Sequence, residues 1–238
     1  MFGGHALRFA TACLSSARRA QEDAPIQPLD LPAKAAQGLA DLLPILTCGE
    51  ASAELVFDDA SRLLPAGFDP DLHRALRSTA DDERRHGIWL AALCDDLPPP
   101  VSHRPAREAA AFLGDLAIAD LGFHLSRVAA LDAGVCIVLA AACARDTPIA
   151  GCARVVDTFV RIRRDEGRHV RISRRCAAAL GVDLATEAAQ RRRVLTAFAQ
   201  LLSTQTLAFA AIGVDLRQVA RRFETAALLP LTSRSETG

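Results

Sequence analysis

The chain has 238 residues and a mass of 25.3 kDa, enough for one large domain or two small ones with a buried core. Apolar residues make up 50% of it and 47 residues are Ala, which excludes a disordered chain and favours a helical protein over a β-sandwich or barrel. The 28 basic residues balance 28 acidic ones, and this zero net charge argues against nucleic acid as the main partner. The absence of Tyr excludes any mechanism that needs a tyrosyl radical.

The first 32 residues are predicted to form an extension and a linker before the folded part of the chain. Residues 1–21 contain three arginines and no acidic residue, so a transit peptide is one interpretation, but we favour a loosely docked N-terminal helix. Three prolines among residues 22–33 indicate a linker. At the other end, residues 231–238 are expected to form a disordered tail.

The apolar pattern predicts an all-α fold, because no segment alternates between apolar and polar residues as a strand does. Asp69 before a proline is typical of a helix start, Pro44 marks a kink, and Pro105 begins a crossover helix. Long helices are expected at residues 33–64, 70–94, 121–145, 148–180, 184–211 and 216–229. The first four would form a four-helix bundle over residues 33–181, and the other two would pack on it as C-terminal helices over residues 182–230.

Seven cysteines are scattered through the chain without a C-x-x-C pair. Free thiols in a reducing compartment explain them better than a disulfide framework, so we expect a cytoplasmic protein. No apolar run reaches 18 residues without a charge, so no membrane span is expected.

One five-residue pattern, D-E-x-R-H, occurs at residues 82–86 and again at residues 165–169. Glu and His three positions apart lie on one face of a helix, so both side chains can bind one metal ion. A charged, solvated helix surface is the ordinary alternative, but such a surface does not require His at matched positions in two halves of the chain. The repeat therefore predicts a metal site.

A carboxylate precedes each motif at nearly the same spacing, so the chain contains two similar halves. Four carboxylates and two imidazoles suit two iron ions, with Mn or a mixed pair as the alternative. Zinc would prefer more His or Cys ligands. The predicted ligands are Glu50, Glu83, His86, Asp132, Glu166 and His169.

With these motifs, residues 39–180 resemble the ferritin-like di-iron carboxylate superfamily. The doubled D-E-x-R-H is similar to the oxygen-activating branch, which includes multicomponent monooxygenase hydroxylases and acyl-carrier-protein desaturases. The resemblance implies a ferritin-like bundle in which the Asp of each motif orients the His of the other, and the Arg steadies the Asp. The orienting pairs would be Asp82 with His169 and Asp165 with His86, and the arginines would be Arg85 and Arg168.

Two residues depart from the pattern of these relatives. Asp132 stands where most of them have Glu, and its shorter arm binds one metal more readily than it bridges two. Ile162 stands where p-aminobenzoate N-oxygenases have an extra His ligand, so we do not assign the chain to them. The lack of Tyr excludes the radical function of the ribonucleotide reductase small subunit.

Two residues near the predicted ligands are candidate pocket residues. Glu54 lies one helical turn after Glu50 and could instead be an extra ligand or a surface residue. Cys136 lies one turn after Asp132, and there we favour a small core residue. Trp89 is expected to be core packing.

The resemblance implies an O2-dependent oxidase or monooxygenase that acts on a small or carrier-bound organic substrate. Its electrons would come from a separate reductase or ferredoxin, because the sequence has no flavin or iron–sulfur motif. A homodimer is an open expectation from the superfamily. The alternatives are a ferroxidase or peroxide-scavenging protein, a tRNA-modifying di-iron hydroxylase, and a helical interaction module without a catalytic role.

Overall fold

The computed structural model describes residues 29–228, so the predictions for residues 1–28 and 231–238 lie outside the described part of the chain. Every regular element within the described range is a helix, which confirms the all-α prediction. The elements are α2 (Ala33–Leu63), α3 (Pro70–Cys94), α4 (Arg104–Leu116), α5 (Leu121–Ala142), the 3-10 helix η1 (Pro148–Gly151), α6 (Ala153–Ala179), α7 (Leu184–Ser203), α8 (Thr206–Ala211) and α9 (Leu216–Leu228).

Local signals explain where several helices begin and end. The carboxylate of Asp69 accepts hydrogen bonds from two backbone N–H groups at the start of α3, 2.8 and 3.3 Å away, and Pro70 takes the first helical position. The carboxylate of Asp183 caps α7 by accepting a hydrogen bond from the backbone N–H of Thr186, 2.6 Å away. Gly181, with a φ of +90°, follows the end of α6 in a left-handed conformation that favours glycine. α2 continues through Pro44 without interruption.

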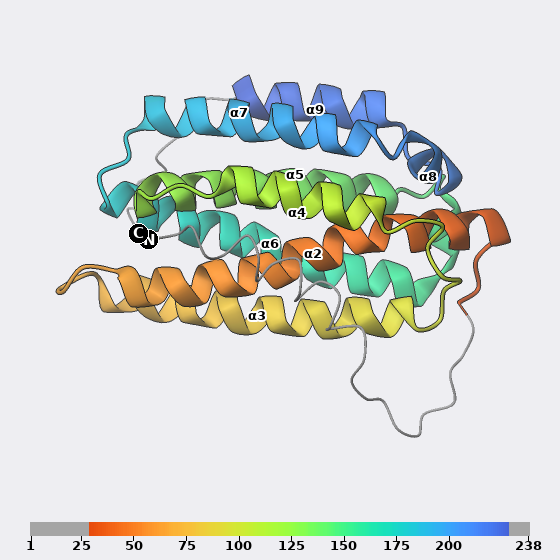
Figure 1. Cartoon of the computed structure of the whole chain (residues 1–238), viewed down its shortest axis with the longest axis horizontal. Coiled ribbons are helices and arrows are strands. Elements are labelled where there is room, and N and C mark those ends of the chain that lie inside the picture. The colour runs from red at the N-terminus through yellow and green to blue at the C-terminus, as the bar shows by residue number, and fades with distance from the viewer. Residues whose placement is uncertain (1–28, 229–238) are drawn as a thin grey trace.

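The long helices are arranged as two antiparallel pairs, α2 with α3 and α5 with α6, and the pairs contact each other mainly through α3 and α6 (Figure 1). The crossover helix α4 connects the pairs and packs on α2. α7 packs on α5, α9 packs on α7, and α8 packs on α2. α7 and α9 therefore form a layer on the side of the molecule away from α3 (Figure 1).

The structure differs from the predicted helices at two places. Residues 148–151 form a 3-10 turn rather than the start of α6, because Cys152 has an extended backbone conformation. The single helix predicted over residues 184–211 is interrupted at Thr204 and Gln205, which separates α7 from α8. The Thr204 hydroxyl donates to the carboxylate of Glu108 on α4, at 2.9 Å, so a tertiary contact holds this interruption.

α5 is the central helix and contacts α6, α7 and α9. By length and composition alone it could cross a membrane, but 56% of its most apolar 18-residue window is buried inside the protein. It also contains Arg127 and Asp132, which are both buried. We therefore interpret its high hydropathy as that of a core helix.

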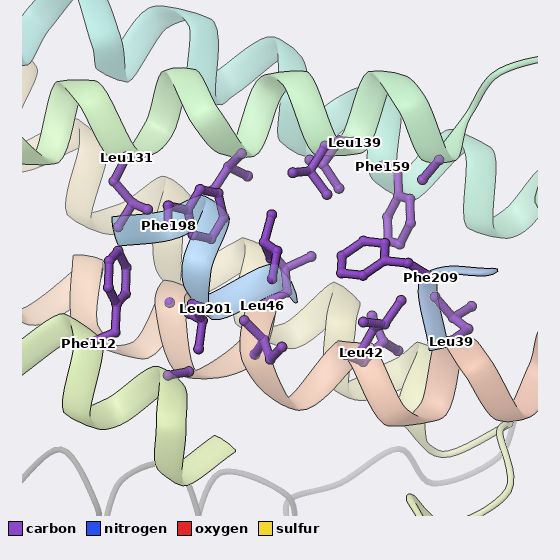
Figure 2. A pocket seen from close by; sticks show the side chains of 18 of the residues that line it. Leu39, Leu42, Leu46, Phe112, Leu131, Leu139, Phe159, Phe198, Leu201 and Phe209 are labelled. Carbon is purple, nitrogen blue, oxygen red and sulfur yellow. The ribbon is translucent and has the colours of Figure 1, made fainter. Parts of the chain in front are cut away.

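The core leaves an elongated apolar cavity in the groove between α2 and α5 (Figure 2). α4, α7, α8 and Phe159 of α6 complete its walls, and the cavity has a volume of about 100 Å³ and opens in part to solvent. Gly49 and Leu131 line one end of the cavity. These residues immediately precede Glu50 and Asp132, so the cavity begins beside two of the predicted ligands.

Candidate metal centre

Four helices bring the six predicted ligands together in the interior of the bundle. α2 contributes Glu50, α5 contributes Asp132, and α3 and α6 each contribute the Glu and the His of their D-E-x-R-H motif. All six residues are no more than 5% exposed. The local cause is the helical repeat, since residues three positions apart point the same way and both motifs turn that face inward.

The donor atoms form two overlapping groups. The first comprises Glu50, Glu83, His86 and Glu166, whose donor atoms all lie within 4.8 Å of one another. The second comprises Asp132, Glu166 and His169. Glu166 belongs to both groups, so the two groups share one carboxylate. Asp132 belongs only to the second group.

Glu83 and Glu166 each reach both imidazoles. Oε2 of Glu83 lies 3.3 Å from Nδ1 of His86, and Oε1 lies 2.9 Å from Nδ1 of His169. The oxygens of Glu166 lie 3.6 and 3.7 Å from the same two nitrogens. Glu50 lies beside His86, with Oε2 3.1 Å from Nδ1. Two carboxylates are therefore shared between two imidazoles.

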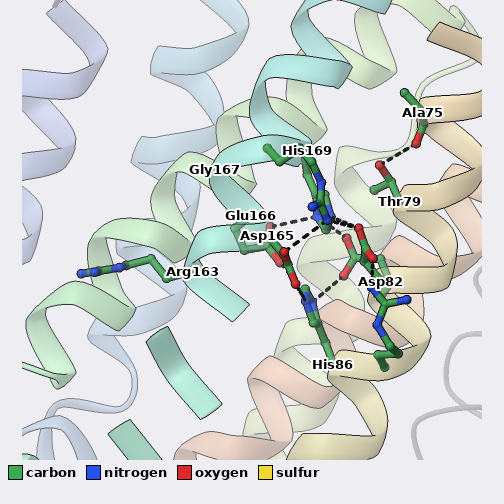
Figure 3. Close-up of polar contacts among 12 residues, drawn as sticks. Ala75, Thr79, Asp82, His86, Arg163, Asp165, Glu166, Gly167 and His169 are labelled. Carbon is green, nitrogen blue, oxygen red and sulfur yellow. Dashed lines mark hydrogen bonds and ion pairs between the residues drawn. The ribbon is translucent and has the colours of Figure 1, made fainter. Parts of the chain in front are cut away.

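The other nitrogen of each imidazole is held by the Asp of the opposite motif (Figure 3). Nε2 of His169 lies 3.2 Å from Asp82, and Nε2 of His86 lies 3.3 Å from Asp165. Because an ionised carboxylate only accepts, Nε2 carries the proton in each contact, and Nδ1 faces the shared carboxylates. These are the orienting pairs that the resemblance implies.

Two arginines neutralise the charge of Asp82. Arg85 on the same helix and Arg168 on α6 both donate to its carboxylate, and Arg168 also pairs with Asp165 at 3.2 Å. Burial alone would raise the pKa of Asp82, but the hydrogen bond from His169 and the two guanidinium groups together lower it. Asp82 is therefore ionised and able to accept a hydrogen bond from Nε2–H of His169.

The carboxylates at the centre resist ionisation because they are buried together. Burial and the charge of Glu83 raise the pKa of Glu50 to about 8. Burial and the charge of Glu166 raise the pKa of Asp132. Burial also raises the pKa of Glu166, against the lowering effect of the His169 imidazole 3.7 Å away. These buried carboxyl groups can therefore ionise together only if positive charge lies beside them.

In the protein without metal, the two imidazoles provide that charge. Burial would lower their pKa values, but the hydrogen bond with Glu50 and the nearby carboxylate of Glu83 raise the pKa of His86 to about 11. Burial would also lower the pKa of His169, but the hydrogen bond with Asp82 and the nearby glutamates raise it to about 12. A metal ion must replace the Nδ1 proton, so metal binding is coupled to proton release.

Several buried oxygen and nitrogen atoms at the centre have no hydrogen-bond partner. They are both oxygens of Glu83, Oδ2 of Asp132 and Nδ1 of His169. Oε1 of Glu83 and Nδ1 of His169 are only 2.9 Å apart, but their relative orientation makes no hydrogen bond. An unpaired buried polar atom costs about 1–3 kcal/mol. Divalent cations between these atoms would satisfy them, so the residues present fit a two-metal site.

The two candidate pocket residues lie outside the donor groups. Glu54 pairs with Arg84 of α3 near the surface, with N–O distances of 2.9 and 3.0 Å. Cys136 is half-buried, and its Sγ donates to the carbonyl of Arg163 at 3.5 Å. Burial raises the pKa of the Cys136 thiol to about 12, so it is protonated. Like the other described cysteines, Cys136 forms no disulfide.

Two aromatic rings pack against the imidazoles. The ring centroids of Phe57 and His169 are 5.8 Å apart, and those of Trp89 and His86 are 5.6 Å apart. Phe57 is buried, whereas Trp89 is half-buried, with the guanidinium of Arg161 6.0 Å from its ring centroid. The rings support the imidazole orientations by packing, the role expected for Trp89.

Two cavities beside the centre were not identified from the sequence. The apolar cavity extends to one side of Gly49 and Leu131, and a second cavity on their other side is lined in part by Ser52, His124 and Asp132. The one sequence signal for them was Gly49. Glycine destabilises the interior of a long helix, so its presence there can indicate that open space is needed beside the helix.

Comparisons with protein-family models, curated proteins and solved structures find no match for this chain. Functional conclusions therefore depend on its own geometry. The described residues establish an all-helical protein with a buried cluster of carboxylates and imidazoles that could bind metal, which is compatible with a di-iron helical protein.

Proposed function

We propose that this protein is an O2-dependent non-haem di-iron oxidase or monooxygenase that acts on a small or carrier-bound organic substrate. We also infer that α2, α3, α5 and α6 correspond to a ferritin-like four-helix bundle. The observation that supports both is the pair of overlapping donor groups, with Glu166 in both and Glu83 within 3.3 Å of both imidazoles. A single structural ion would need only one group of donor atoms, not two overlapping groups.

The donor set favours iron over zinc. Four carboxylates and two imidazoles provide mainly hard oxygen ligands with one His for each ion, which suits Fe(II) or Mn(II). Zinc sites use more His or Cys. A manganese or mixed pair is the alternative, and metal analysis distinguishes it from two iron ions.

The proposed ligands are the four carboxylates and the two imidazoles. Glu83 and Glu166, which both lie near the two imidazoles, would hold the ions together with Glu50 and Asp132. The Nδ1 atoms of the two histidines would complete the ligand set. When bound, two ferrous ions supply the electrons that O2 reduction requires.

The aspartates of the two motifs position the imidazoles rather than bind metal. Each accepts a hydrogen bond from the Nε2–H group of a histidine, which fixes the ring and leaves Nδ1 available as a ligand. Arg168 contacts both Asp82 and Asp165, so one guanidinium supports both orientations.

The apolar cavity supports an organic substrate, because it offers a water-poor space beside Glu50 and Asp132. A ferroxidase or peroxide-scavenging protein would not need such a space. Electrons would come from a separate reductase or ferredoxin, since the sequence contains no flavin or iron–sulfur motif.

Metal analysis and O2 consumption of the purified full-length protein test this proposal. We expect two iron ions per chain, and O2 consumption by the reduced protein that increases with an organic substrate. Glu83→Ala removes a carboxylate that lies near both imidazoles and should lose most of the metal and the activity. Glu54→Ala is the matched control, because it removes a glutamate one turn from Glu50 on the same helix but outside both donor groups.

Two results would contradict the proposal in different ways. Protein without Fe or Mn, or unchanged metal content in Glu83→Ala, would exclude the two-metal site. Iron or peroxide turnover that is independent of every organic substrate would instead favour a ferroxidase or peroxide-scavenging protein.

A further inference from the structure

The apolar cavity is a slot that follows α2 and α5 away from the metal centre (Figure 2). On α2 its lining extends from Gly49 back to Leu39, and on α5 from Leu131 on to Ala142. At 1.5 Å per helical residue, each of these stretches is about 15 Å long. One end of the slot therefore lies at the carboxylates that follow Gly49 and Leu131, and the other lies about 15 Å away.

α8 closes the far end of the slot, where Phe209 and Ile212 line it. α8 packs closely on α2 because residue 38 is Gly. A Cβ on Gly38 would lie 2.7 Å from Cβ of Ala211 and 2.8 Å from the carbonyl oxygen of Ala208. This close contact gives the slot a fixed end, which limits the length of a ligand.

The lining of the slot determines the chemistry of a ligand. Its side chains are those of Leu, Ile, Val, Ala and Phe, and the remaining lining residue is Gly49. A polar group placed among them would lose its water without gaining a partner, whereas each methylene gains free energy by leaving water. The slot therefore selects hydrocarbon, and its elongated shape favours a chain (Figure 2).

Gly49 keeps open the junction between the slot, the metal centre and the second cavity. It lines both cavities, and a Cβ on it would have no neighbouring atom within 4 Å. A helix is less stable with glycine than with alanine at such a position, so the space is retained at the expense of the helix. Beyond the junction, Ser52, Asp59 and His124 offer polar atoms in the second cavity.

We propose that the slot binds an unbranched hydrocarbon chain of the substrate and places one of its methylene groups beside Glu50 and Asp132. The polar end of the molecule lies in the second cavity. The substrate class is thus a molecule with an aliphatic chain, such as a fatty alcohol or a fatty acyl group, rather than a small polar compound. Oxidation of the chain rests on the proposed function, but its binding does not, because protein side chains alone form the slot.

Calorimetric titration of the full-length protein, both metal-free and iron-loaded, tests the inference with 1-hexanol, 1-decanol and 1-hexadecanol. We expect 1-decanol to bind at least tenfold more tightly than 1-hexanol, because more methylenes are buried. 1-Hexadecanol should gain nothing further, because α8 closes the slot. Decanoyl pantetheine distinguishes the sources of the chain: tighter binding than 1-decanol supports a carrier-bound substrate, and weaker binding supports a free one.

Substitutions at the two ends of the slot provide the structural test. Gly49→Leu fills the junction and should weaken 1-decanol binding at least tenfold. Gly87→Leu is the matched control, because Gly87 is also inside a helix and a Cβ on it would have no neighbouring atom within 4 Å, but it lies outside both cavities. Ala142→Val shortens the far end and should shift the preference toward 1-hexanol.

Equal affinity for the three alcohols, or unchanged 1-decanol binding in a folded Gly49→Leu protein, would overturn the inference even if iron binds normally. Alcohol binding in a protein that takes up no iron would overturn the proposed function and leave the slot intact. If Gly49→Leu does not fold, the chain-length series and Ala142→Val decide, because neither depends on residue 49.

Discussion

Two glycines in α2 should respond oppositely to the same substitution. In Gly49→Ala the new methyl group enters open space, with no atom within 4 Å, so the gain in helix propensity is retained. That gain is about 0.5–1 kcal/mol. In Gly38→Ala the methyl group would lie 2.7 Å from Cβ of Ala211, and overpacking of this kind costs about 1–3 kcal/mol, so a net loss of up to about 2.5 kcal/mol is expected after the same gain in helix propensity.

These magnitudes are measurable for a protein of this length. A change of 1 kcal/mol shifts Tm by about 2–4 °C in a chain of 150–250 residues. Gly49→Ala should therefore raise Tm by about 1–4 °C, and Gly38→Ala should lower it by up to about 10 °C. Urea denaturation of the metal-free full-length protein measures the free energy of unfolding directly, because metal binding would otherwise add its own stabilisation.

The sign of the change in unfolding free energy in each variant tests the packing at the two ends of the slot. If Gly49→Ala is destabilising, the space at the junction of the two cavities is absent and the slot does not reach the metal centre. If Gly38→Ala is stabilising, α8 does not pack closely on α2 and the slot has no fixed end. An unchanged urea m-value in both variants would confirm that the substitutions act on the native packing.

Three further predictions concern the centre and its surroundings. Asp165→Asn should weaken iron binding about 10–100-fold, because His86 loses its orienting carboxylate; equal affinity by calorimetry would contradict this. Glu54→Gln should change the unfolding free energy by at most about 1 kcal/mol, since its pair with Arg84 is near the surface, and a larger loss in urea would refute it. Burial lowers the pKa of His124 below its unfolded value, so the unfolding free energy should fall as pH drops below about 6.5, and less steeply in His124→Gln.

Local regularities made much of the centre predictable. The choice of Glu50 over Glu54 followed from the matching positions of Glu50 and Asp132 before their motifs, and the structure places Glu50 in a donor group and Glu54 beside Arg84. The interruption at Thr204 was not predictable, because it involves a hydrogen bond to Glu108, far away in the sequence.

The sequence by itself determined which residues share a helical face, because a helix repeats every 3.6 residues and this depends only on spacing along the chain. It therefore identified the two Glu–His pairs and the cap at Asp69. Only the tertiary structure could test the implied contact of each imidazole with the Asp of the opposite helix, and only it decided that an apolar slot begins at Gly49. Both depend on how separate helices approach one another, and that approach is set by side-chain packing between residues distant in sequence.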